Sequence, residues 1–161
     1  AILTRANLKN SDLTDTDLIG ANLSKANLRD ALVEKANLID AILKGTQLQG
    51  ADFTHANLSN VDLSRKNLTG VILTKAVLTG ANLENTDLSG KNLTGINWQH
   101  AQLVNVDMTG ANISNSDFRG AKMNNLILTS ATVSDTRGLS IYTSSDWRDV
   151  FIRYVFYDNR I

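Results

Sequence analysis

The side chains that could carry chemistry are few and scattered. The two histidines, His55 and His100, each stand two residues after an aromatic residue. A metal site needs three or four convergent ligands, and the chain has no Cys to supply any. Serines and threonines recur at one position of a short repeat, and no serine has a neighbouring histidine to act as its base. We therefore expect no metal, no cofactor and no catalytic site.

The charged residues are balanced rather than biased. Lys and Arg number 16, Asp and Glu number 16, and the formal net charge is zero. This balance removes the usual electrostatic argument for a nucleic-acid partner or an anionic membrane. No apolar run approaches the roughly 18 residues of a membrane span. We expect a protein partner, with no nucleic acid and no membrane span.

A five-residue period positions all of these side chains. A hydrophobic residue stands at every fifth position from Leu3 to Val133, in 27 consecutive units. Ala usually precedes it by two residues, Asn or Asp precedes it by one, and nine of the ten glycines follow it by two. This period fits neither a 3.6-residue helix nor a two-residue strand. It indicates a backbone that makes a quarter turn every five residues.

The same period predicts which side chains face inward. The small and the large residue of each unit are two apart, so both point into the coil, and the Asn or Asp between them points outward. Four units close a square, and squares stacked about 4.8 Å apart pair as in a parallel sheet. The glycine position is predicted to be a turn that favours relaxed dihedral angles. The sequence thus predicts an all-β chain, a quadrilateral parallel β-helix of about seven coils over residues 1–135.

Several stretches carry a resemblance to a known family. Units such as Ala21-Asn22-Leu23-Ser24-Lys25 and Ala51-Asp52-Phe53 resemble the A(D/N)LXX motif of pentapeptide-repeat proteins. The resemblance covers residues 1–135 and implies a right-handed quadrilateral β-helix. The family includes cyanobacterial proteins of unknown role, bacterial effectors and gyrase-protecting DNA mimics, and the motif does not say which of these applies.

Two units depart from the pattern. Lys66 and Lys91 occupy the inward small-residue position, each in the string Lys-Asn-Leu-Thr-Gly. Because a buried unpaired ammonium is costly, each stem is expected to extend toward a corner of the square. The alternative is a local opening of the coil that has a function.

The repeat stops after Val133. Residues 134–145 read as an irregular exit, and residues 147–157 as a helix with N-cap candidates at Ser144, Ser145 and Asp146. Residues 136–161 would thus form an exit loop and a capping helix that covers the last coil. Ile152 and Phe156, four residues apart on its far side, suggest a homodimer through this C-terminal helix or docking onto another domain. The alternative is that this pair folds back under the exit loop.

Stacking would also align charges at the corners of the square. One corner carries Arg5, Lys25 and Arg65, with Lys44 beside it, and another carries Asp15, Lys35, His55 and Lys75. These groups could contact an anion or an acidic partner, or they could be solvated faces that protect the edges of the sheet by their charge. In the outward position, Asp87 above Asp107 is the only adjacent acidic pair.

These observations predict a non-catalytic scaffold that binds a protein partner. The alternative is a DNA-mimicking protein that binds DNA gyrase or another topoisomerase, which should show long rows of carboxylates spaced like phosphates. An enzyme is the third class, and no site supports it. The chain begins at Ala1, already in register and without an initiator Met, so a removed targeting segment stays open; the cytoplasm is slightly favoured.

Overall fold

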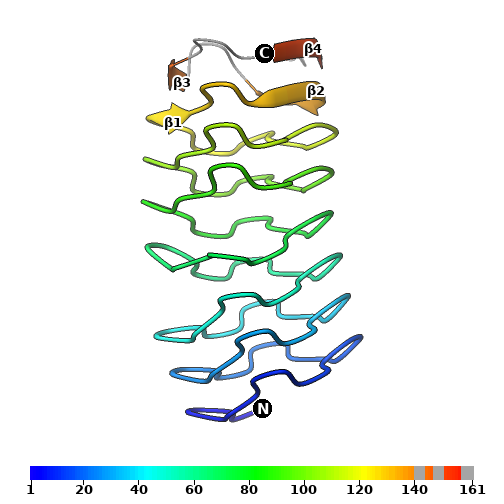
Figure 1. Ribbon diagram of the computed structural model, residues 1–161, viewed down its shortest axis with the longest axis vertical. Helices are drawn as coiled ribbons and strands as arrows, with labels where there is room; N and C mark the ends of the chain where they lie inside the picture. The colour runs from blue at the N-terminus through cyan, green and yellow to red at the C-terminus, as the bar shows by residue number, and fades with distance from the viewer. Residues whose placement is uncertain (140–143, 147–150, 157–161) are drawn as a thin grey trace.

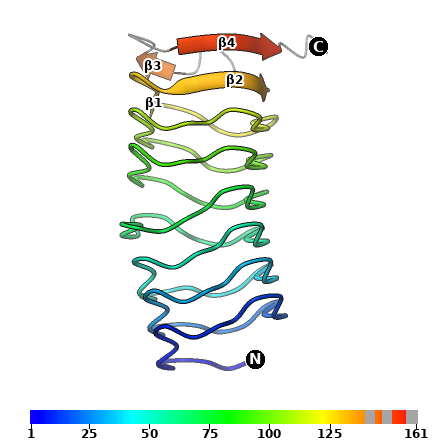
Figure 2. The ribbon, with the colours of Figure 1, turned by 45° about the vertical axis from the view of Figure 1, so that its right-hand side comes forward.

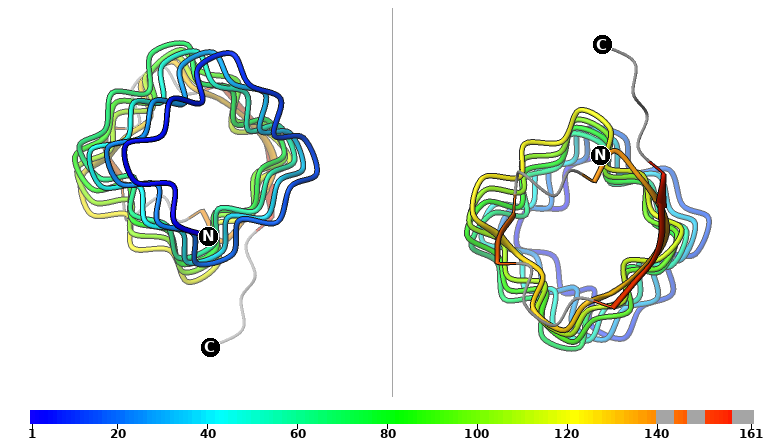
Figure 3. Two further views of the ribbon diagram at one scale, coloured as in Figure 1. Left: turned by 90° about the horizontal axis from the view of Figure 1, so that it is seen from below. Right: turned by 90° about the horizontal axis from the view of Figure 1, so that it is seen from above.

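The protein is a four-sided rod of stacked coils. The computed structural model describes residues 1–139, 144–146 and 151–156, with side chains for residues 1–139. Isolated parallel bridges join residues twenty apart, from Ile2 and Asn22 to Asp117 and Arg137. Figures 1 and 2 show the coils stacked along one axis, and Figure 3 shows the square cross-section. From the N-terminal end the chain turns clockwise as it recedes, so the β-helix is right-handed (Figure 3).

Each corner of the square is a tight turn. The Ala6 N–H donates to the Leu3 carbonyl over 3.0 Å, and this bond recurs along the chain. Every fifth residue from Arg5 to Asp135 has a positive φ, at nine glycines and 18 other residues. A type II turn requires a positive φ at its third residue, which explains the five-residue period and confirms the turn predicted at the glycine position. The outward side chains support the turns: Asn22 Oδ1, for example, accepts the Ser24 N–H at 3.0 Å.

The core is a stack of aliphatic rungs, as the period predicts. The hydrophobic centre residues are buried from Leu18 to Val133, with the inward alanines between them. Aromatic side chains replace aliphatic ones at three fully buried centre positions, and Trp98 stacks on Phe118 with ring centroids 5.9 Å apart. The Trp98 indole N–H is buried without a hydrogen-bond partner.

The regular strands lie at the C-terminal end of the rod. They are β1 (Leu126–Ile127), β2 (Thr132–Arg137), β3 (Ser144–Asp146) and β4 (Phe151–Phe156). β1 pairs in parallel with β3, and β2 pairs in parallel with β4. The β2–β4 register joins residues nineteen apart, such as Thr132 and Phe151, whereas the coils below it use twenty. β4 therefore lies on the upper edge of β2 (Figures 1 and 2).

The helix predicted over residues 147–157 is wrong at Phe151–Phe156, which form β4. This segment is rich in aromatic and β-branched residues, which favour strands, and the open edge of β2 offers a ladder to pair with. Six residues are also too few for periodicity to separate a strand from a helix. Residues 147–150 and 157 lie outside the described residues.

The strand also changes the setting of Ile152 and Phe156. Their backbones are the register partners of Val133 and Arg137, so the helical spacing behind the predicted homodimer contact is absent. Their side chains lie outside the described part. β2 runs to Arg137, past the expected end of the repeat region at residue 135, and the predicted exit 134–145 includes parts of β2 and β3. No helix long and apolar enough to cross a membrane occurs among the described residues.

Candidate interaction surface

The basic corner predicted from the sequence lies along one edge of the rod. Arg5 and Lys25 occupy successive coils of the same corner, and the Arg5 N–H donates to the Ser24 carbonyl over 2.9 Å. Lys44 follows in the next coil and Arg65 in the one after, and all four side chains are exposed. Gly45 takes the corner position between Lys25 and Arg65. The structure thus brings these four cations together in the N-terminal half of one edge.

The same edge changes character farther along the rod. Asn85, Asn105 and Asn125 succeed the cations, and their side-chain amides form a ladder with N···O distances of 3.2 and 2.9 Å. The corner therefore offers positive charge only in its first four coils, and a chain of neutral amides above them.

Exposed aliphatic side chains stand beside the basic corner, which the sequence analysis missed. Ile2 is 87% exposed and Ile42 is 49% exposed, although both occupy the outward position usually held by Asn or Asp. Asn22 bridges to Ile2 below it and to Ile42 above it, so the three lie on one face. That face combines apolar and cationic side chains.

Polar residues in the inward position bond to the coil below. The hydroxyls of Thr46 and Ser116 donate to the carbonyls of Leu23 and Leu93, each 23 residues earlier, at 2.8 and 3.0 Å. Lys66 and Lys91 occupy the same inward position and also bond to a carbonyl 23 residues earlier. Lys66 Nζ donates to the Leu43 carbonyl at 2.6 Å, and Lys91 Nζ donates to the Leu68 carbonyl at 2.8 Å.

The longer lysine stems are accommodated by an opening of the ladder. Among the described residues, the regular bridges that would join 42 to 62, 47 to 67, 67 to 87 and 72 to 92 are absent. Asn67, at the centre of this region, has no bridge on either side. Both lysine side chains are partly buried. The structure therefore shows the local opening that was the sequence-based alternative, and its function stays a prediction.

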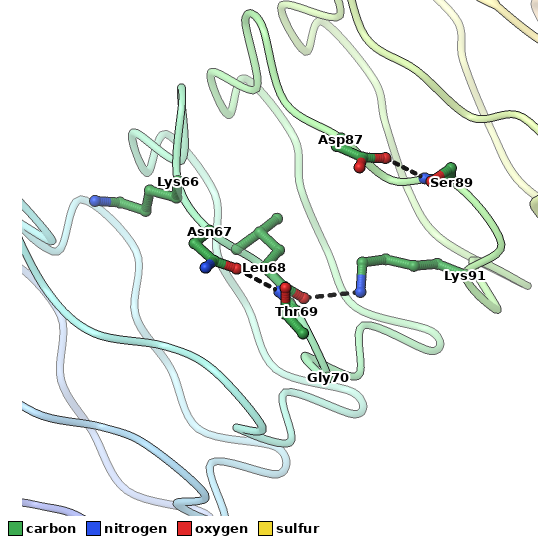
Figure 4. A pocket seen from close by; sticks show the side chains of 8 residues that line it. All are labelled: Lys66, Asn67, Leu68, Thr69, Gly70, Asp87, Ser89 and Lys91. Atoms are coloured by element: carbon green, nitrogen blue, oxygen red, sulfur yellow. Dashed lines mark hydrogen bonds between the residues drawn. The ribbon is translucent and has the colours of Figure 1, made fainter.

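Each opening forms a cleft. The first, of about 470 Å³, lies between the coil of Lys66–Gly70 and that of Asp87–Lys91. Figure 4 shows Lys91 reaching across this cleft while Lys66 points away from it. Lys66 lines the second cleft, of about 660 Å³, together with Asp62, Lys44 and Ile42. The two clefts are neighbours around one corner.

The electrostatics of the two lysines are alike. Burial lowers the pKa of Lys66 and of Lys91, and an aspartate four residues earlier, Asp62 or Asp87, partly opposes this shift. Neither lysine has a carboxylate within ion-pair distance among the described residues, where Arg119–Asp117 is the salt bridge formed, at 2.6 Å. The ammonium groups are thus held by backbone carbonyls rather than by carboxylates.

A sequence signal for these clefts exists. Residues 62–70 and 87–95 share the string Asp-Leu-Ser-X-Lys-Asn-Leu-Thr-Gly, in which only the fourth residue differs. The two copies are 25 residues apart, which is one coil plus one side of the square. The duplication could have identified Asp62 and Asp87 as the charged neighbours of the two lysines.

The remaining candidates do not converge. His55 and His100 occupy corner positions, with φ of 59° at each. No group of His, Asp or Glu able to hold a metal ion occurs in the described ranges. Asp117 is the carboxyl with the largest pKa shift: desolvation opposes the shift, but hydrogen bonds from Arg119 and Gln99 outweigh it and lower the pKa to about 2. Asp87 and Asp107 are bridged neighbours.

A right-handed, four-sided β-solenoid with turns every five residues defines a class of repeat proteins. The chain belongs to the pentapeptide-repeat family. The family profile, described as Pentapeptide repeats, matches in eight copies across residues 1–38, 34–65, 51–90 and 92–125. A comparison with curated proteins gave no match.

Solved structures of the same family resemble this chain. One is HetL, a pentapeptide-repeat protein involved in heterocyst differentiation regulation, from the cyanobacterium Nostoc sp. strain PCC 7120. It is 28% identical with a TM-score of 0.63, and the match covers 93% of this chain and 65% of HetL. The chain thus spans about two thirds of HetL. Another is trypsin-treated QnrB1, a plasmid-mediated fluoroquinolone resistance protein, 20% identical with a TM-score of 0.41 over 98% of this chain and 86% of that one.

Proposed function

We propose that this protein is a non-catalytic scaffold that binds a protein partner on one face of its rod. The observation that carries the proposal is the face formed by Ile2, Asn22 and Ile42 beside the basic corner. Exposed aliphatic side chains next to arginine fit protein–protein interfaces, whose centres are apolar and whose rims are polar. The regular stacking of coils supports this role, because solenoids present extended surfaces of constant geometry.

The charge of this face indicates the chemistry of its partner. Arg5, Lys25 and Lys44 lie in three successive coils that the ladder holds at the spacing of paired strands, and Arg65 follows across the second cleft. An acidic surface on the partner would complement them and speed its association. HetL, the relative with the higher TM-score, carries a regulatory description, and a regulator that acts by binding is compatible with this scaffold.

The test is capture of partners by the immobilised protein, followed by mass spectrometry. The double variant Arg5→Glu/Lys25→Glu should lose the captured partner, because it reverses the charge of the basic corner. The matched control is Lys35→Glu/Lys75→Glu, which changes two lysines at a different corner and should retain it. Equal capture by both double variants would contradict the proposed face.

The alternative, a DNA mimic that binds DNA gyrase or another topoisomerase, has less support. A mimic needs rows of carboxylates, and Asp87–Asp107 is the only bridged pair of aspartates in the outward position of the described coils. The net charge is zero. The basic corner also has the wrong sign for a surface that imitates DNA.

A further inference from the structure

The unit Lys66–Gly70 has lost its ladder bonds on the upper edge and keeps one on the lower edge, from the Gly50 N–H to the Thr69 carbonyl at 3.0 Å. In the regular coils, the centre and corner N–H groups donate upward, as Leu3 does to Asn22, and the outward N–H donates downward, as Asn22 does to Ala1. Among the described residues, Leu68, Gly70 and Asn67 make none of these bonds. Their amide groups therefore face the clefts without the partners that the other coils provide.

The segment on the other side of the cleft, Asp87–Lys91, also lacks ladder bonds on the edge that faces the cleft. The Asp87 N–H has no acceptor in the coil below it, and the carbonyls of Asp87 and Ser89 receive no ladder bond within the described part of the chain. Free donors and acceptors thus alternate along both lips of the 470 Å³ cleft. This alternation is the hydrogen-bonding pattern of a parallel strand edge.

The charges in the cleft limit what can occupy it. Lys91 spans the cleft, and its ammonium already donates to the carbonyls of Leu68 and Val71, at 2.8 and 3.3 Å. Asp87 contributes one negative charge on the opposite lip, and its carboxylate accepts the Ser89 N–H at 2.9 Å. The charges of Lys91 and Asp87 cancel, and the third charged residue of the lining, Lys66, points away from the cleft (Figure 4), so an ion of either sign gains little net attraction there. A peptide backbone is neutral and offers donors and acceptors at a spacing that matches both lips.

We propose that the cleft between Lys66–Gly70 and Asp87–Lys91 binds an extended peptide segment of a partner protein, which adds its backbone to the open edges of these two coils. Addition of a strand to an exposed edge is a general mode of peptide recognition, in which main-chain bonds supply affinity. One side of the square is five residues long, so the segment is about one repeat unit in length. This inference rests on the proposed scaffold function and names one of its binding sites.

The lysines determine the availability of this site. Lys91 holds the coils apart. Its ammonium bonds to a carbonyl 23 residues earlier, and at Ser116 a shorter hydroxyl makes the equivalent bond while the coils stay paired. A serine at position 91 should let Leu68 and Gly70 pair again with Asp87 and Ser89. The open edges, and with them the peptide site, depend on a single side chain.

The experiment uses the full chain labelled with ¹⁵N and a defined peptide. The probe is an N-acetylated and C-amidated peptide with the sequence of residues 56–60, Ala-Asn-Leu-Ser-Asn, which is uncharged. We expect it to shift the amide resonances of Leu68, Gly70 and Asp87, with a dissociation constant on the order of 1 mM. The same peptide with N-methylated backbone amides should shift none of them, because it cannot donate.

Two further arms make the result decisive. Lys91→Ser should weaken binding of the peptide by about tenfold or more, the loss expected when one or two backbone hydrogen bonds are no longer available; Lys91→Thr repeats the test if the serine variant does not fold. Inorganic phosphate should leave the same resonances unchanged. Equal shifts with the N-methylated peptide, shifts with phosphate, or no shift with any probe would each overturn the peptide site.

These results separate the cleft from the proposed scaffold function. If the peptide fails to bind but Arg5→Glu/Lys25→Glu still abolishes partner capture, only the cleft is disproved. If the peptide binds and neither corner variant affects capture, the basic face is disproved and the cleft stands.

Discussion

At the scale of single residues, the side chain in the inward small-residue position decides whether two neighbouring coils pair or separate. Ala fills this position in most units, a hydroxyl adds one hydrogen bond to the coil below, and lysine makes the same bond only by separating the strands. At Ser116 and Thr46 the inward hydroxyl and the ladder coexist, whereas at Lys66 and Lys91 the ladder is interrupted. Side-chain length, rather than polarity, is the physical difference.

The first prediction follows from this position. Lys91→Ser should raise the free energy of unfolding by on the order of 1 kcal/mol, because ladder bonds at Leu68 and Gly70 form again and no ammonium is desolvated. Chemical denaturation of the two proteins measures the difference. The control Lys9→Ser changes an exposed lysine and should alter stability by less than about 0.5 kcal/mol. A less stable Lys91→Ser protein would show that the lysine stabilises the opening.

The second prediction concerns acid stability. Asp117 has a pKa lowered to about 2, so the folded state binds fewer protons than the unfolded state as the pH falls from about 4 toward 2. The stabilisation by its bonds to Arg119 and Gln99 is therefore present above the unfolded pKa and is lost as the pH falls through the folded value. Asp117→Asn should be less stable than the parent at neutral pH, by less than about 1 kcal/mol because the pair is partly exposed, and equally stable near pH 2. Melting temperatures across this range test it, and a difference that persists at pH 2 contradicts it.

At the scale of elements, the C-terminal strand protects an edge. β2 ends the series of coils, and β4 pairs with it along five register positions from Thr132 to Arg137. An uncovered parallel edge is a template for aggregation, so β4 replaces the lid that the sequence suggested as a helix.

The third prediction tests this role. A protein that ends before β4, at residue 150, should melt at a lower temperature and aggregate more readily than a protein that ends at Phe156. The amides of β2 should lose protection from hydrogen exchange in the shorter protein, while those of the central coils retain it. The longer truncation is the matched control, because it keeps the whole of β4. Unchanged exchange at Val133 and Ser134 in the shorter protein would refute the role of β4.

The sequence predicted the elements unevenly, for physical reasons. The coil was predictable because all 27 units repeat the same residue pattern, so an atypical residue in one unit does not change the prediction for the whole. β4 was not, because its residues satisfy both an amphipathic helix and a strand, and the choice depends on the free edge of β2. The clefts were predictable only in part. Lys66 and Lys91 marked their positions, but whether the ladder opens depends on how far Leu43 and Leu68 can move from the coil above.

At the scale of the whole molecule, the rod is electrostatically balanced but unevenly charged along its length. The cations of one corner stand in the N-terminal half, and the amide ladder Asn85–Asn105–Asn125 follows them. Such a rod has a direction that a partner can recognise, even though its net charge is zero.

The fourth prediction applies to the molecule as a whole. The protein should neither inhibit DNA gyrase nor protect it in a supercoiling assay at micromolar concentration, because its carboxylates do not form a continuous row. A DNA mimic would bind with a strong dependence on salt. Inhibition that weakens as salt is raised would instead favour the topoisomerase-binding alternative.

The register of the last pair of strands has a consequence for assembly. Coils that repeat every twenty residues keep their corners aligned, so in principle any number of them could be added, and separate rods could grow end to end into fibres. The β2–β4 pair is one residue shorter. β4 occupies the edge of β2 with which the first coil of another rod would pair, and its register differs from that of the coils below it. β4 thus acts against end-to-end growth at this end of the rod.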